Sequence, residues 1–253
     1  MSIIIHIAPG YEHLRPYAEK IASEGLPAEV EDVYRSRRNR IVKWQCDGID
    51  LNIKAFRVPL FPNDYVYGHL RGSKAKRSLE NATRLRELGF GTPEPIAYIE
   101  RRRKGRLRES YYISRHISTD GDMRLWLDNP EAQAALPELA ALMVRMHAAG
   151  VWHKDFSPGN IMFRKRDDGT HDFFLVDLNR MKFGVKNKKR QMRNFGTIYI
   201  ESMEETAHLA RLYADAAGID REQTELAARK ELGKYYRRKK RHRATKRFFG
   251  LGK

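Results

Sequence analysis

The most informative stretch of the sequence is His153-Lys154-Asp155-Phe156-Ser157-Pro158-Gly159-Asn160. It follows a predicted helix whose apolar stripe ends at Gly150, and it precedes a predicted hairpin around an Asp168-Gly169 turn. The second strand of that hairpin ends in Leu175-Val176-Asp177. The sequence therefore places an aspartate and an asparagine in one turn, and a second aspartate directly after a buried strand.

Asp155, Asn160 and Asp177 together have the chemistry that phosphoryl transfer requires. The reaction needs a carboxylate at the acceptor hydroxyl, oxygen ligands for magnesium and a cation on the nucleotide phosphates. The H-x-D-x-x-x-x-N spacing supplies the first carboxylate and an amide ligand, and Asp177 supplies a metal carboxylate. In the structural alternative, Asp155 caps a turn, Asn160 bonds the backbone and Asp177 merely ends a strand. Because these elements occur together and in order, we favour the phosphoryl-transfer interpretation.

The N-terminal third is typical of an antiparallel sheet. Residues 31–35 and 40–44 are predicted to pair as strands. Asp47-Gly48 is a two-residue hairpin turn, because glycine supplies the positive φ that such turns require. Apolar and polar residues then alternate from Ile49 to Ala55, which predicts a half-buried strand.

One helix and two further strands complete the first half. Apolar residues at helical spacing predict a helix over 73–88, and Gly89 is a natural end for it. Two strand-like runs follow, over 96–100 and 111–117. The first half therefore predicts a sheet plus one helix.

The second half is mainly helical. The sequence becomes helical in character from Pro130, and four apolar residues at helical spacing, Leu139, Leu142, Met143 and Met146, predict a helix. Two more helices are predicted, one from Ser202 toward Gly218, and one that Asp220 caps and that runs into the basic tail.

This order of elements predicts a two-lobed α+β fold. The N-lobe, residues 1–117, contains the antiparallel sheet and its helix. The C-lobe, residues 118–233, is mainly helical and contains the hairpin after the H-x-D stretch. A basic tail spans residues 234–253.

The composition is that of a folded basic protein. The 253 residues include 49 Lys and Arg against 32 Asp and Glu, a formal net charge of +17, and 41% are apolar. That apolar share is too high for a disordered polycation. The single cysteine, Cys46, cannot form an internal disulfide, and no run approaches the ~18 apolar residues of a membrane span. Without a signal-peptide pattern, we expect a soluble protein of a reducing compartment whose partner is anionic.

The H-x-D constellation resembles the eukaryotic-protein-kinase-like superfamily over residues 32–177. The resemblance implies ATP and Mg²⁺ as cofactors. It implies that Asp155 orients or deprotonates the acceptor hydroxyl, that His153 braces the catalytic loop, and that Asn160 and Asp177 hold the magnesium.

The same resemblance assigns a lysine and a glutamate. Lys54 stands where the superfamily's strand lysine grips the α and β phosphates. Glu80, in the helix that follows, would be its ion-pair partner, and Glu87 is the rival candidate.

Four segments look like the bacterial lipopolysaccharide kinases, which are the Kdo and core-heptose kinases (Kdo is 3-deoxy-D-manno-octulosonic acid). The segments are Lys74–Ala82, Thr92–Tyr98, His153–Asn160 and Val176–Gly184. Those enzymes resemble protein kinases but use ATP to phosphorylate a sugar hydroxyl of the inner core. The resemblance implies ATP and an anionic glycolipid, a lipid A precursor with Kdo or core sugars, as partners. It also implies a cytoplasmic protein with peripheral contact to the inner membrane.

Three features depart from the protein-kinase pattern. No glycine occurs between Gly25 and Gly48, so the Gly-rich phosphate loop is missing and side chains of the turn from Arg35 to Arg40 are its candidate replacement. The magnesium motif reads Asp177-Leu178-Asn179, and no Ala-Pro-Glu follows it. The remaining sequence is short for a peptide-docking platform, which favours a small-molecule or glycolipid acceptor.

Two other functions stay open. One is a kinase for proteins or for a cationic antibiotic, although an antibiotic kinase needs an acidic groove that the net charge disfavours. The other is an inactive kinase-like scaffold that binds nucleic acid or membrane through its basic faces. The basic tail from Lys234 to Arg247 fits a solvated helix end, a membrane contact or a non-specific nucleic-acid contact. Phe248 and Phe249 favour the membrane contact, and no specific nucleic acid is expected.

Overall fold

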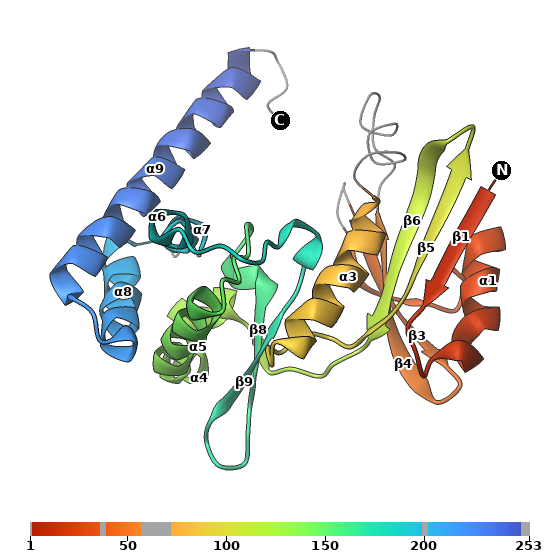
Figure 1. The fold of residues 1–253 in the computed structure, drawn as a ribbon, viewed down its shortest axis with the longest axis horizontal. Helices are drawn as coiled ribbons and strands as arrows, with labels where there is room; N and C mark the ends of the chain where they lie inside the picture. Colours follow the sequence, from red (N-terminus) through yellow and green to blue (C-terminus); the bar gives the residue numbers. More distant parts are fainter. Residues whose placement is uncertain (1, 36–38, 57–71, 199–201, 249–253) are drawn as a thin grey trace. The chain divides into compact units, whose positions relative to one another are not determined.

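The computed structural model of the chain describes residues 2–35, 39–56, 72–198 and 202–248. The chain divides into two compact units, each with its own sheet and helices (Figure 1). The N-terminal unit comprises Met1–Ser118 with Asp177–Asn179, and the C-terminal unit comprises Thr119–Val176 with Arg180–Lys253. The segment Asp177–Asn179 is thus part of the N-terminal unit, although it directly follows a strand of the C-terminal one.

The N-terminal unit is built on a six-stranded sheet in the order β1-β5-β6-β4-β3-β2. Its described strands are β1 (Ser2–Ile7), β2 (Glu31–Arg35), β3 (Asn39–Cys46), β4 (Ile49–Phe56), β5 (Pro95–Arg103) and β6 (Arg106–Arg115). Its described helices are η1 (Glu12–Leu14), α1 (Arg15–Glu24) and α3 (Lys74–Glu87). All neighbouring strands of this sheet run antiparallel.

Local turn chemistry fixes the register of the central strands. Asp47 and Gly48 have φ values of 51° and 72°, and this pair of positive φ angles matches the twist of the two strands that the turn joins. Trp44 accordingly lies opposite Leu51, and Cys46 opposite Ile49. The predicted hairpin is confirmed, as is the pairing of β2 with β3.

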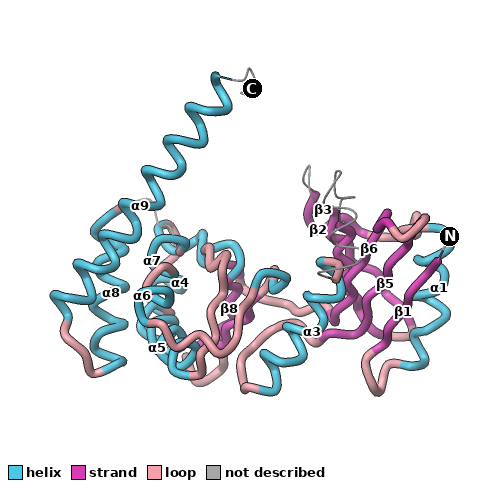
Figure 2. The backbone as a smooth tube through the Cα atoms, turned by 45° about the horizontal axis from the view of Figure 1, so that its top comes forward, coloured by secondary structure: helices cyan, strands magenta, loops and turns pink. Residues whose placement is uncertain are grey.

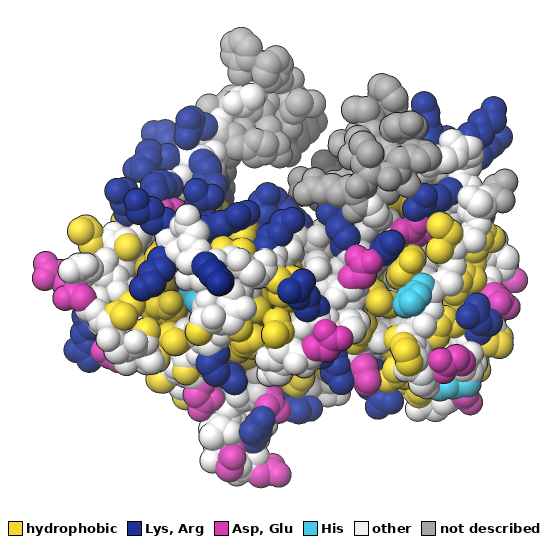
Figure 3. Space-filling model, viewed as in Figure 1, with side chains coloured by type: hydrophobic (Ala, Val, Ile, Leu, Met, Phe, Trp, Pro, Cys, Tyr) yellow, Lys and Arg dark blue, Asp and Glu magenta, His cyan; other side chains and the backbone are white. Residues whose placement is uncertain are grey.

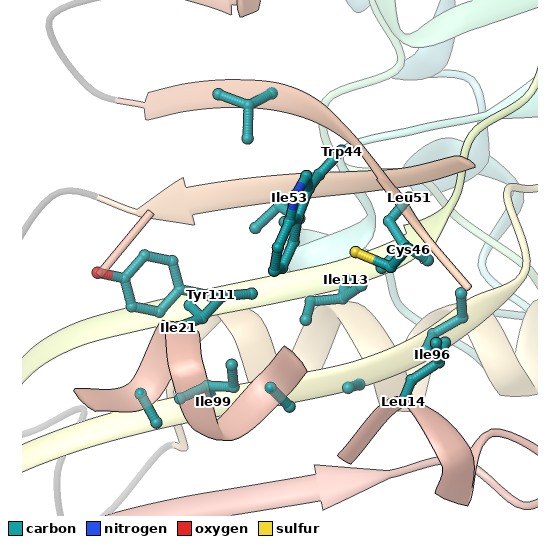
Figure 4. Packing of buried hydrophobic residues seen from close by; sticks show 14 residues of the cluster. Leu14, Ile21, Trp44, Cys46, Leu51, Ile53, Ile96, Ile99, Tyr111 and Ile113 are labelled. Carbon is teal, nitrogen blue, oxygen red and sulfur yellow. The ribbon is translucent and has the colours of Figure 1, made fainter. Parts of the chain in front are cut away.

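Helix α1 covers one face of the sheet and closes a hydrophobic core with it (Figure 4). The core joins Ile21 of α1 to Ile53, Ile99 and Ile113 of the sheet, all of them almost completely buried. Cys46 lies in the same cluster, and burial raises the pKa of its thiol to about 12. Cys46 is thus a core residue rather than a reactive thiol.

Helix α3 packs on the other face of the sheet (Figures 1 and 2). Its N-cap Ser73 accepts a hydrogen bond of 3.0 Å from the Lys76 amide, and Gly89 follows its end with a φ of 78°. Because side chains alternate along a strand, Lys54 of β4 points away from the core that contains Ile53. Lys54 therefore lies on the face that α3 covers.

Two elements of this unit were not predicted, β1 and α1. Strand β1 lies at the edge of the sheet with mostly exposed side chains, so its sequence lacks the apolar alternation of a half-buried strand. Helix α1 begins without a side-chain cap hydrogen bond. The expectation of a sheet with one helix is therefore corrected to a sheet with a helix on each face.

The C-terminal unit has a three-stranded sheet in the order β7-β8-β9, and helices pack beside it. Its described strands are β7 (Gly121–Asp122), β8 (Ile161–Lys165) and β9 (His171–Leu175). Its described 3-10 helices are η2 (Met123–Leu127) and η3 (Pro158–Asn160); η4 (Leu178–Arg180) lies at the point where the chain passes between the units. Its described α-helices are α4 (Pro130–Ala134), α5 (Leu136–Ala148), α6 (Lys188–Gln191), α7 (Asn194–Thr197), α8 (Met203–Ala217) and α9 (Arg221–Phe248).

The three helices predicted for this unit are present with two differences, and the short helices α6 and α7 were not predicted. The single helix expected from Pro130 to Gly150 is broken at Ala135, because Pro137 lacks an amide donor and disfavours helical backbone before it. The apolar stripe of α5 is buried as predicted. Helix α9 continues without interruption through the predicted tail boundary at residue 234. Among the described helices, none is both long enough and apolar enough to cross a membrane.

Candidate active site

The catalytic loop begins where α5 ends, and the fully buried ring of His153 organises it. His153 Nδ1 accepts a hydrogen bond of 3.1 Å from the amide of Asp155. This leaves the proton on Nε2, which lies 3.0 Å from the carbonyl oxygen of Val176 and donates to it. One neutral imidazole thus links the loop that presents Asp155 to the end of β9.

Asn160 holds the same loop from its other end. Its side-chain Nδ2 donates to the main-chain oxygen of Asp155 at 2.8 Å, and its own carbonyl accepts from the Val176 amide at 3.0 Å. Within the described residues the amide oxygen of the Asn160 side chain accepts no hydrogen bond, so it is the atom that can face a ligand. Asp155 is partly exposed, as a group that meets an acceptor must be.

A second set of site residues meets in the N-terminal unit. Lys54 Nζ lies 2.7 Å from Oδ1 of Asp177, and the two side chains are 14% and 25% exposed. The pair joins residues 123 positions apart in the sequence. Asn179 Nδ2 also donates to Asp177 Oδ1 at 2.7 Å, and Asn81 of α3 donates to the Leu178 carbonyl at 2.7 Å. The carboxylate of Asp177 is therefore held by a cation and an amide.

The backbone at Asp177 is strained. Its φ of 57° lies in the left-handed region, which only glycine adopts without steric cost but which aspartate tolerates better than most residues. Such strain, on the order of 1 kcal/mol or more, persists where surrounding contacts fix the residue, and it is concentrated at functional sites. Here the contacts of Asn179 and Asn81 hold the segment in place.

The predicted ion pair between Lys54 and Glu80 is wrong for this structure. The face of α3 that meets the sheet contains Ala75, Ser78, Leu79, Ala82 and Leu85. Glu80 lies beside this face, is 54% exposed and approaches Lys76 at 3.8 Å. The rival candidate Glu87 is exposed as well. The partner of Lys54 is Asp177, because the helical phase of α3 turns both glutamates away from the lysine.

The donor set fits magnesium. Mg²⁺ is bound by hard oxygen ligands, usually one or two from the protein together with substrate phosphates and water. Asp177 offers a carboxylate that Lys54 and Asn179 hold, and Asn160 offers a side-chain amide oxygen. The part of the chain that the structure describes contains no group of three or more His, Cys, Asp or Glu side chains that could hold a metal. Asp177 is thus a candidate magnesium ligand of the N-terminal unit, and Asn160 is one of the C-terminal unit.

The candidate replacement for a Gly-rich loop is only partly visible. Residues 36–38, in the turn between Arg35 and Arg40, lie outside the described residues. Arg40 itself pairs with Asp32 at 2.6 Å. The role of this turn in holding phosphates stays a prediction.

A buried polar network behind the catalytic loop was missed from the sequence. Asn194 of α7, 1% exposed, donates from Nδ2 to the carbonyl of His153 at 2.8 Å. Its Oδ1 lies 3.0 Å from Nε2 of His147, whose Nδ1 lies 3.0 Å from the Tyr213 hydroxyl. The network joins α5, α7 and α8 to the catalytic loop. The members of this network are single residues that no repeating pattern connects, so the sequence gave no signal for the network.

Replacing Asn194 with alanine is expected to lower the free energy of unfolding by about 2–4 kcal/mol, because it leaves the His153 carbonyl and the His147 ring without their buried partner. Denaturant unfolding followed by circular dichroism measures this. Asn187→Ala is the matched control, since Asn187 is exposed and caps only the short helix α6, which predicts a loss of about 1 kcal/mol or less. Equal losses in the two variants would contradict the role of the network.

Stability is also expected to depend on pH through His147. Burial lowers the pKa of this ring below its ordinary value. Between the folded pKa and about 6.5 the unfolded chain binds the proton and the folded chain does not, so the free energy of unfolding falls as the pH falls. Unfolding at pH 7.5 and 5.5 should show a smaller difference in His147→Gln than in the wild type. The same difference in both proteins would contradict this assignment.

Comparison with known proteins identifies a matching family and a similar fold. The family described as lipopolysaccharide kinase (Kdo/WaaP) matches residues 31–215, a range that includes every predicted site residue. No curated protein matches the sequence. Among solved structures, WaaP in complex with acyl carrier protein is similar over 95% of this chain and 99% of that chain, with 17% identity and a TM-score of 0.63. The Rio2 kinase in an ADP/Mg²⁺–phosphoaspartate complex from Chaetomium thermophilum is similar over 88% and 75%, with 16% identity and a TM-score of 0.49. The WaaP match confirms the expected α+β fold.

Proposed function

We propose a specific reaction for this chain, which belongs to the Kdo/WaaP lipopolysaccharide kinase family and is therefore a phosphotransferase. In this reaction it transfers the γ-phosphate of ATP to a sugar hydroxyl on a Kdo or heptose of a lipid A precursor. The observation that supports this most strongly is the contact of 2.7 Å between Lys54 and Asp177, because it unites a phosphate-binding cation with a metal-binding carboxylate from distant parts of the sequence. The acceptor is an alcohol group of the lipopolysaccharide inner core.

Each site residue has a defined task in this reaction. Asp155 accepts the proton of the acceptor hydroxyl, and the contacts of His153 and Asn160 keep its loop in one conformation. Lys54 neutralises the nucleotide phosphates. Asp177 and Asn160 would hold Mg²⁺, which when bound neutralises the charge on the phosphate oxygens. Catalysis is thus mainly positioning and electrostatic stabilisation.

The ion pair also explains how Lys54 is kept ready for a nucleotide. Its ammonium group is largely buried, and a buried cation needs an anionic partner to offset the loss of water. Asp177 is that partner in the structure. Phosphate oxygens would offer the ammonium group a second set of anionic acceptors, and so the lysine is oriented before the nucleotide arrives.

We further propose peripheral binding to the cytoplasmic face of the inner membrane through the basic half of α9. This half contains Lys234, Arg237, Arg238, Lys239, Lys240 and Arg241. Each Lys or Arg near an anionic surface contributes about 1 kcal/mol. Co-sedimentation with phosphatidylglycerol vesicles tests this: binding should weaken when Lys239, Lys240 and Arg241 are replaced by glutamine. Equal binding to neutral phosphatidylcholine vesicles would contradict it.

The function is tested by incubating the purified protein with radiolabelled ATP, Mg²⁺ and a Kdo-bearing lipid A precursor. Label should enter the glycolipid. Parallel reactions with a precursor that lacks Kdo and with a precursor that carries heptose identify the sugar that accepts the phosphate. A basic protein and a peptide library serve as competing acceptors. Transfer to peptides alone would favour the protein-kinase alternative. No transfer to any glycolipid, with nucleotide and metal bound, would reject the acceptor.

A further inference from the structure

The segment that follows Asp177 is strongly and uniformly basic. We define the basic segment as residues 180–193, which contain no Asp or Glu. Its cationic residues, all exposed, are Arg180, Lys182, Lys186, Lys188, Lys189, Arg190 and Arg193. In the space-filling view, Lys and Arg side chains gather over the part of the C-terminal unit that contains α6, α7 and α9 (Figure 3). A high density of one charge on one surface raises the local concentration of oppositely charged ligands.

The charge of the basic segment is not compensated by the protein. Within the described residues, none of its seven cations forms an ion pair with a carboxylate. Other basic residues of the same unit do: Arg164 and Arg166 pair with Asp172, and Lys165 pairs with Glu131. Cations that are left without acidic neighbours repel one another, which costs stability unless a ligand supplies the missing negative charge.

The basic segment is attached directly to the catalytic loop. Lys182 and Trp152 exchange two backbone hydrogen bonds, of 2.8 and 2.9 Å. The guanidinium group of Arg190 lies 4.6 Å from the centre of the Trp152 ring, a cation–π contact. At the end of the segment, Asn194 donates to the His153 carbonyl at 2.8 Å. The backbone of the basic segment is therefore fixed relative to the residues that immediately precede Asp155.

We propose that the basic segment is the acceptor-recognition surface of the enzyme. Its lysines and arginines bind the phosphate and carboxylate groups of the anionic glycolipid, and this binding brings the sugar hydroxyl to Asp155. The inference rests on the proposed function, because it names the part of the chain that selects that acceptor. Charge-assisted hydrogen bonds to phosphate and carboxylate suit both residue types, with arginine able to bind in bidentate fashion.

A nucleic-acid ligand is disfavoured at this surface. Single-stranded nucleic acids are held by basic grooves together with exposed aromatic rings on which bases stack. Trp152 is 5% exposed and its ring already carries Arg190. The Trp152 ring is therefore not available for base stacking, which favours a sugar that carries phosphates and carboxylates as the ligand.

The test uses the full chain with Lys186, Lys188 and Lys189 replaced together by glutamine. These side chains are exposed and without acidic partners in the described structure, so the fold should be unaffected. We expect the KM for the Kdo-bearing lipid A precursor to rise about tenfold, since exposed ion pairs contribute a few tenths to 1 kcal/mol each. The KM for ATP should stay within about twofold, because the nucleotide is assigned to Lys54 rather than to this segment.

A matched control removes the same charge from the other unit. Arg103→Gln, Lys104→Gln and Arg108→Gln together change three exposed residues around the β5–β6 turn. This variant should keep the wild-type KM for the acceptor. Removing the lipid A phosphates from the acceptor should shrink the difference between wild type and the basic-segment variant. Added salt should raise the wild-type KM more steeply than that of the variant, because exposed charges are screened.

The outcomes separate this inference from the proposed function. If the wild type phosphorylates the glycolipid and the basic-segment variant keeps its acceptor KM, the inference is wrong and the function stands. If the wild type transfers nothing, the proposed function is wrong, and direct binding decides the inference. In that assay, fluorescently labelled lipid A precursor should bind the variant about tenfold more weakly than the wild type. Equal dissociation constants would overturn the inference.

Discussion

The Asp155→Asn variant is expected to lose about 10³-fold in kcat and to keep its affinity for ATP. An amide cannot accept the proton of the acceptor hydroxyl, so the general-base contribution disappears. The loop itself should survive, because His153 and Asn160 contact the main chain of residue 155 and not its carboxylate. Single-turnover transfer to the glycolipid measures the loss, and a fluorescent ATP analogue measures the retained binding.

This variant also separates an enzyme from an inactive scaffold. A scaffold has no turnover in the wild type that the substitution could remove. Asp167→Asn is the matched control, since Asp167 is an exposed residue in the turn between β8 and β9. The control should keep wild-type turnover. An Asp155→Asn protein that transfers phosphate at the wild-type rate would exclude Asp155 as the base.

The second large effect is expected at Lys54. The Lys54→Met variant should lose about 10²–10³-fold in kcat/KM for ATP, because one preorganised charge at a reacting phosphate contributes on the order of 3–4 kcal/mol. The same substitution also removes the Lys54 contact from the Asp177 carboxylate, while the contact from Asn179 remains. Steady-state kinetics with ATP as the varied substrate, at saturating glycolipid, measure the loss.

Glu80→Gln is the control that distinguishes the observed pair from the expected one. Glu80 is exposed and near Lys76, so its substitution should change kcat/KM for ATP by less than about twofold. A loss as large as that of Lys54→Met would show that Lys54 and Glu80 pair during turnover. In that case the pairing of Lys54 with Asp177 would not describe the active protein.

The parts of the fold that were predictable are those with local signals. Asp47-Gly48 allows one kind of hairpin, so the register of β3 and β4 follows from two residues. Ser73 at the start of α3 and Ser202 at the start of α8 accept hydrogen bonds from amides three residues later, as capping patterns predict. The catalytic loop was recognised because its polar residues have fixed spacing between a helix and a hairpin.

The features that were missed depend on contacts between distant residues. The edge strand β1 is largely exposed, and only its pairing with β5 defines it. The phase of α3 against the sheet decides that Ser78 and Leu79 are buried while Glu80 is exposed, and spacing from Lys54 cannot reveal that phase. Asn194 acts through partners from two other segments, so its sequence neighbours gave no indication of its role.

The account depends most on the assignment of Lys54, Asp177 and Asn160 to one nucleotide and its metal. A crystal structure with a non-hydrolysable ATP analogue and Mg²⁺ measures this directly. We expect Lys54 Nζ to contact the α and β phosphates, and the carboxylate of Asp177 and the amide oxygen of Asn160 to coordinate Mg²⁺. A nucleotide bound away from Lys54, or a metal held without Asp177, would contradict the account.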